Sequence, residues 1–250
     1  ILRAARRGLV GEALGWLALD LGGHPRLLAG GHVGRGEARR PAPGGRHIDI
    51  DMSIRDDIPT AGDTAQHERV LADVRRWLER AVIGLNLCPF AKAVHVKQQV
   101  HYAVYHQDDE AGLLDALLFE AAELVAHDDS VRDTTLLVAP GMLTDFLDFN
   151  DFTGRAERRL ARAGFDGVLQ LASFHPRFQF TGSEEDDIGN ATNRAPYPIL
   201  HLLREDSVSR AVEAFPEAAE IFERNIETLE RLGPQGWAAL EVGPGGESRP

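Results

Sequence analysis

The sequence contains a single cysteine, Cys88, in 250 residues. It also lacks any hydrophobic run near the ~20 residues that a membrane-spanning helix needs. One cysteine excludes an internal disulfide framework and fits a reducing compartment, so we expect a cytoplasmic protein. Basic residues are scarce too, because 27 Lys and Arg stand against 39 Asp and Glu, for a net charge of −12. This balance disfavours nucleic acid and anionic membranes as partners.

Several common catalytic motifs are absent as well. There is no G-x-G-x-x-G, P-loop, G-x-S-x-G, C-x-x-C or H-E-x-x-H pattern, which disfavours the nucleotide-binding, α/β-hydrolase and zinc-protease classes that depend on them. The remaining composition, 43% hydrophobic and 26% charged, is ordinary for a globular protein.

The first 51 residues differ from the rest of the chain. They hold 11 of the 25 glycines, no Phe, Tyr or Lys, and eight Arg against five acidic residues. Such a segment has too little apolar content to offset the entropy of ordering it. We therefore expect residues 1–51 to be a disordered or non-native extension, with the native chain starting at Met52. A single α/β domain over 52–242 and a loose tail over 243–250 complete the expected organisation.

Hydrophobic periodicity predicts the elements of that domain. Apolar residues spaced three and four apart predict helices over about 64–85, 108–127, 142–163, 207–215 and 217–232. Strands are predicted over 100–106, 134–139, 167–174 and 199–203. This alternation favours a sandwich with a small, mostly parallel or mixed sheet of about four strands and helices on its faces. A ferredoxin-like α+β fold is the alternative.

The chain from Phe174 to Glu205 is the predicted site, because a long, polar connection inside a compact domain is typical of function. His175 ends the third strand and is the candidate acid/base. Cys88 precedes a possible short helix and is the candidate nucleophile; its alternative is a small buried hydrophobe. His201 lies on the same strand face as Ile199, where a lone histidine is more often a core residue than a ligand.

Two kinds of ligand are considered for this connection. In the first, Arg194 is a fork for a carboxylate or phosphate, with Asn190, Asn193 and Tyr197 as further substrate-binding groups. In the second, a divalent metal ion is held by oxygen and nitrogen ligands. Its ligands would be His175, His201, Asp186 and Asp187.

Four separated blocks in the chain resemble a known bacterial family. They are G-L-N-L-C-P-F-A (84–91), S-F-H-P-R-F-Q-F (173–180), the acidic pair with N-A-T-N-R-A-P-Y-P (186–198) and I-L-H-L-L-R-E-D-S-V (199–208). In this order they resemble the proteins of domain of unknown function 1415, over about Gln66 to Leu240. The resemblance implies one cytoplasmic domain starting near Met52, and it assigns no activity, cofactor or catalytic residue.

The leading interpretation is a small-molecule enzyme that acts on an anionic substrate, with His175 as acid/base and Cys88 as a nucleophile. A metal-dependent enzyme is the second interpretation. The third is a non-catalytic binding protein that presents Phe178, Phe180 and Tyr197 to a partner.

Overall fold

A four-stranded mixed sheet forms the centre of the computed structural model, which describes residues 61–214 and 220–245. Its strands are β1 (Val100–Val104), β2 (Thr134–Val138), β3 (Leu169–Phe174) and β4 (Ile199–Arg204), in the order β1-β2-β4-β3. β1 and β2 are parallel, whereas β4 runs antiparallel to both of its neighbours. The predicted α/β fold with a small mixed sheet is confirmed. The extension predicted over 1–51 lies outside the described residues, as do the last five residues of the predicted tail.

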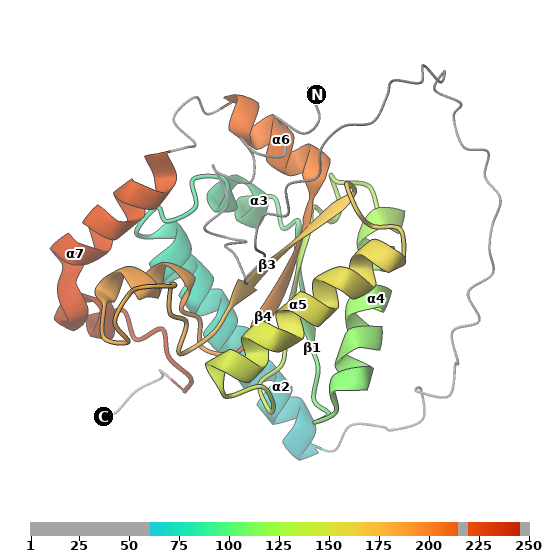
Figure 1. Cartoon of the computed structure of the whole chain (residues 1–250), viewed down its shortest axis with the longest axis horizontal. Coiled ribbons are helices and arrows are strands. Elements are labelled where there is room, and N and C mark those ends of the chain that lie inside the picture. Colours follow the sequence, from blue (N-terminus) through green and yellow to red (C-terminus); the bar gives the residue numbers. More distant parts are fainter. Residues whose placement is uncertain (1–60, 215–219, 246–250) are drawn as a thin grey trace, which may run out of the picture.

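Two long helices cover one face of the sheet: α4 (Glu110–Ala126) and α5 (Phe146–Arg162). In Figure 1, α5 crosses in front of the strands and α4 lies to their right. Leu200 and Leu202 of β4 pack there with Leu117 of α4 and Phe152 of α5. Asp109 and Asp145 cap the starts of these helices by accepting hydrogen bonds from backbone N–H groups, which satisfies donors that a helix start leaves unpaired.

The opposite face packs against α2 (Ala61–Trp77) and its continuation η2 (Leu78–Ile83), a π-helical turn. Val74 and Trp77 contact a cluster that includes Leu136 of β2 and Ile199 of β4. The alternation predicted along the fourth strand is therefore confirmed. α3 (Ala91–Val96) and α6 (Glu205–Ala214) lie beyond the end of α2 (Figure 1).

The connection between β3 and β4 folds into a 3-10 helix, η3 (Ile188–Asn193), which packs against α7 (Ile221–Ala239). The predicted helix end near Gly233 is a kink, since Gly233 adopts φ 68° and the chain then resumes a helical course to Ala239. None of the described helices is long and apolar enough to cross a membrane.

Candidate functional site

A cavity of about 390 Å³ lies on the α2 face of the sheet. Known small-molecule sites have volumes of roughly 300 to 1,000 Å³, so this cavity could hold a small ligand. Strands form its floor, and η2, the loop before α3, α3 itself and α6 form its walls. Most of the lining is apolar, and the polar exceptions are Cys88, Asp133, Thr134, Thr192, His201, Ser207 and Arg210.

The register of the strands shows where the residues of the cavity floor lie. Phe174 pairs with Ile199 at one end, and Thr134 pairs with Leu203 at the other. His201 lies between them, where it pairs with Leu136 of β2 and Ala172 of β3. The imidazole therefore stands at the middle of the cavity floor.

The hydrogen bonds of Thr134 determine which nitrogen of His201 carries the proton. The Oγ1 atom of Thr134 lies 2.7 Å from the carbonyl oxygen of Leu202 and 2.6 Å from Nε2 of His201. Two oxygen atoms this close need a hydrogen between them, so the single hydroxyl proton of Thr134 is donated to Leu202. Thr134 must then accept from His201, which makes Nε2 the protonated nitrogen and Nδ1 the one with a lone pair.

The Nδ1 atom of His201 is buried and has no hydrogen-bond partner among the described residues. Burial lowers the pKa of His201 to about 4 and is the only cause of that shift. The imidazole is therefore neutral at pH 7, and Nδ1 is a hydrogen-bond acceptor. Leaving such an acceptor unpaired costs ~1–3 kcal/mol.

Two further polar residues are part of the cavity lining. Thr192 of η3 is 4% exposed, and its hydroxyl has no hydrogen-bond partner within the described ranges. Cys88 lies in the wall, where burial raises the pKa of its thiol more than the backbone N–H groups of Phe90 and Ala91 lower it. The sulfur is thus a neutral thiol at pH 7, which departs from the thiolate that a catalytic nucleophile requires.

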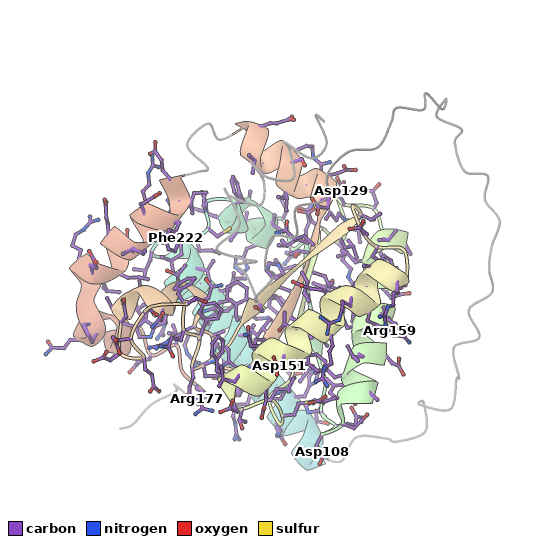
Figure 2. The ribbon with its side chains drawn as sticks, in the orientation of Figure 1. Asp108, Asp129, Asp151, Arg159, Arg177 and Phe222 are labelled. Carbon is purple, nitrogen blue, oxygen red and sulfur yellow. The ribbon has the colours of Figure 1, made fainter. Side chains whose placement is uncertain are left out.

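At one end of the cavity, a chain of hydrogen bonds joins α6 to the loop before β2. Ser207 donates to Asp133 at 2.5 Å, and Arg210 donates to Ser207 at 3.0 Å and to Asp129 at 2.7 Å. Figure 2 shows Asp129 beside the end of α6. The charged groups at this end are therefore engaged with one another.

The structure separates His175 from Cys88. The His175 ring stacks on Phe149 in the core beneath α5 and is fully buried, on the opposite face of the sheet from the cavity. Its Nε2 lies 3.0 Å from the carbonyl of Leu143, and its Nδ1 accepts from the N–H of Arg177 at 3.0 Å. Leu143 has a positive φ of 52°, so His175 holds a strained turn in place, and the expected pairing with Cys88 does not form.

The predicted anion-binding residues act within the loop. Arg194 donates to the carbonyls of Phe178 and Glu185. The amide of Asn190 accepts from the N–H of Phe180 and from the hydroxyl of Ser183, and it donates to the carbonyl of Glu184. These bonds fold the connection onto itself.

The other predicted substrate groups also have partners outside the cavity. Asn193 donates to the carbonyl of Ser173 at 3.4 Å, and Tyr197 donates to the carboxylate of Asp73 at 2.7 Å. Neither of them lines the cavity, and the same is true of Asn190 and Arg194.

The predicted metal ligands do not converge. Asp187 caps η3 by accepting from the N–H of Gly189, Asp186 is exposed on the loop, and His175 and His201 lie on opposite faces of the sheet. In the part of the chain that the structure describes, no three His, Cys, Asp or Glu side chains form a group that could hold a metal ion.

Of the residues predicted from sequence, Cys88 and His201 meet in this cavity. Thr134 and Thr192 were missed. The alternation of β2 could have placed Thr134 on the His201 face, whereas Thr192 lies in an irregular segment whose sequence carries no comparable signal.

The described residues thus form one α/β domain with a ligand-sized cavity against one face of its sheet. The chain belongs to the family described as a protein of unknown function, DUF1415, whose profile matches residues 69–239. The resemblance seen in the sequence is thereby confirmed. Searches among curated proteins and solved structures found no match to this chain.

Proposed function

We propose that this protein binds a small, mainly apolar molecule in the cavity above His201. The observation that carries the proposal is the cavity of about 390 Å³, whose lining is mostly apolar and whose floor holds the neutral imidazole of His201. A concave apolar site with a few convergent polar groups and a perturbed titratable residue supports the same interpretation.

An enzymatic use of the cavity is the second candidate function. It is favoured because the cavity lining contains both an imidazole and a thiol, those of His201 and Cys88. In this proposal His201 replaces His175 as the acid/base group. The low pKa of His201 makes it a weak base and a good hydrogen-bond acceptor, which is why binding ranks ahead of catalysis.

An anionic substrate has less support than an uncharged one. Arg194 is directed at loop carbonyls, and the cation of the cavity lining, Arg210, is bonded to Asp129. A buried anion would have no compensating charge beside His201, and burying an unpaired charge is costly. A cytoplasmic location remains part of the proposal because the lone thiol fits a reducing compartment.

Filling the cavity tests the proposal. Ala211 of α6 lines the cavity, whereas Ala214, three residues further along the same helix, is exposed and does not. Wild type, Ala211→Trp and Ala214→Trp are dialysed against a metabolite extract of the native host, and the enriched compounds are identified by mass spectrometry. We expect the same compounds to be enriched by wild type and Ala214→Trp and lost with Ala211→Trp. Enrichment that Ala211→Trp leaves intact, or no enrichment by wild type, contradicts the proposal.

A time course of the same mixtures separates the two candidate functions. If the site is catalytic, the enriched compound declines in the presence of wild type, a product accumulates, and His201→Phe stops this conversion. If the protein only binds, the compound is recovered unchanged.

A further inference from the structure

We infer that the ligand of this cavity is an amphiphile with an apolar body and a cationic head, and that the head binds beside Asp133 at the α6 end of the cavity. The α6 end is formed by Asp133, Ser207 and Arg210. The inference rests on the proposed function and deepens it by naming the chemical class of the ligand and its orientation.

Among the residues that the structure describes, the polar side chains in the middle of the cavity are buried or engaged. The Nδ1 atom of His201 and the hydroxyl oxygen of Thr192 are both inaccessible. The hydroxyl of Thr134 is bonded to His201 and Leu202, and Cys88 contributes a neutral thiol, which is a weak donor. A polar ligand group placed here would lose its hydrogen bonds to water without replacing them, which is costly. The part of the ligand above the floor is therefore apolar.

The two ends of the cavity differ in polarity and in exposure. At one end, the rings of Trp77 and Phe174 meet edge to face at 5.1 Å between centroids, and the two residues are only 2% and 7% exposed. The indole N–H of Trp77 is donated to the carbonyl of Arg194 at 2.8 Å. At the α6 end, by contrast, the Arg210 side chain is 60% exposed. The apolar body of the ligand therefore belongs against the rings, with its head at the α6 end.

The α6 end carries a carboxylate that has no cationic partner. Arg210 is paired with Asp129 at 2.7 Å. Asp133 accepts from the hydroxyl of Ser207 at 2.5 Å instead, and no Lys, Arg or His side chain of the described residues forms an ion pair with it. Two carboxylates against one guanidinium leave one negative charge in excess at this end, in a chain whose net charge is −12. This balance favours a cation and disfavours an anion.

An ammonium group has the chemistry that this end requires. It offers three N–H donors and no acceptor, and a charge-assisted hydrogen bond to a carboxylate is roughly twice as strong as a bond between neutral groups. Asp133 is partly exposed, so water can solvate the remaining N–H groups and the charge need not be fully buried.

The dimensions limit the size of the ligand. A volume of about 390 Å³ equals the share of roughly a dozen water molecules at ~30 Å³ each. The floor from Ile199 to Leu203 covers four strand steps, about 13 Å at ~3.3 Å per step. An aromatic ring with a short linear chain and one head group fits both limits.

Three matched probes test the inference by calorimetric titration at pH 7: 4-phenylbutylamine, 4-phenylbutanol and 4-phenylbutanoate. They share a phenyl ring and a linear chain and differ in having a cationic, a neutral or an anionic head. We expect the amine to bind at least about fivefold more tightly than the alcohol, because its head is a charged donor, and the carboxylate to bind most weakly. Asp133→Asn should weaken the amine at least about fivefold and leave the alcohol within about twofold, since Asn loses the charge and keeps an acceptor for Ser207.

Asp206→Asn is the matched control. Asp206 lies on α6 next to Ser207, is exposed and does not line the cavity, so the variant loses the same charge from the same region. The amine should keep its preference in this variant.

The outcomes separate this inference from the proposed function. An amine that binds no better than the alcohol overturns the cationic head and leaves the cavity as a binding site. The same conclusion follows if Asp133→Asn does not reduce the preference for the amine, or if Asp206→Asn reduces it equally. Failure of all three probes to bind, or binding that Ala211→Trp does not affect, overturns the proposed function together with the inference.

Discussion

His201 should make the stability of the protein depend on pH between about 4 and 6.5. Its pKa is about 4 in the folded protein, against 6.5 without burial. The unfolded chain therefore binds more protons than the folded protein in this window, so stability falls as the pH is lowered through it. At about 1.4 kcal/mol for each pH unit, the full effect is about 3 kcal/mol.

The measurement is urea unfolding of wild type and His201→Phe at pH 7 and pH 4.5. Over this interval wild type should lose about 2.5 kcal/mol more than the variant, which corresponds to a midpoint difference of ~1 M urea. His101 and His175 also have lowered pKa values. They are present in both proteins, so their contributions cancel in the comparison. Equal losses in the two proteins would refute the reasoning that burial keeps His201 neutral.

His175→Phe provides the contrast at pH 7. Both ring nitrogens of His175 are hydrogen-bonded, to the carbonyl of Leu143 and the N–H of Arg177. Removing the ring leaves two part-buried backbone groups without this partner, at up to ~1–3 kcal/mol each. His175→Phe should therefore be destabilised by about 2–5 kcal/mol, whereas His201→Phe should stay within about 1 kcal/mol of wild type, because it also removes an unpaired nitrogen.

Three further predictions concern the groups that sequence analysis singled out. Arg194→Ala should lower the free energy of unfolding by about 2 kcal/mol, because two loop carbonyls lose a charged donor. Amide hydrogen exchange should become faster in the 178–190 loop, and unchanged exchange would contradict the role of Arg194 in holding this loop together. Tyr197→Phe should cost only about 1 kcal/mol by urea unfolding, since Asp73 keeps its bonds to Arg76 and Gly245; a loss of several kcal/mol would show that these bonds do not compensate. At pH 7.5, iodoacetamide should alkylate Cys88 at least about tenfold more slowly in the folded protein than in the urea-unfolded protein, because burial raises the pKa of the thiol. Equal rates in the two states would show that Cys88 is a reactive thiolate in the folded protein.

The sequence predicts the elements of this fold well because their periodicity is local. The alternation of β4, with His201 on the face of Ile199 and against that of Leu200, follows from the geometry of any strand. The packing of the two faces then follows from which residues are apolar. Pairing and order of the strands are not local properties, so the sequence left both a parallel and a mixed sheet open.

The site was harder to predict, for a physical reason that His175 and His201 illustrate. Both are histidines on or next to a strand, yet one has partners for both nitrogens and the other does not. That difference depends on the carbonyl of Leu143 and the hydroxyl of Thr134, each more than thirty residues away in sequence. Arg194 poses the same difficulty, since a guanidinium binds a carbonyl or a carboxylate with the same atoms.

The most direct test of the site is a long-range ¹H–¹⁵N NMR spectrum of protein labelled at histidine. At pH 7, His201 should be neutral and carry its proton on Nε2, because Thr134 donates its hydroxyl proton to Leu202 and accepts from His201. A proton on Nδ1 of His201, or on both of its nitrogens, would contradict the neutral imidazole described for the floor of this cavity.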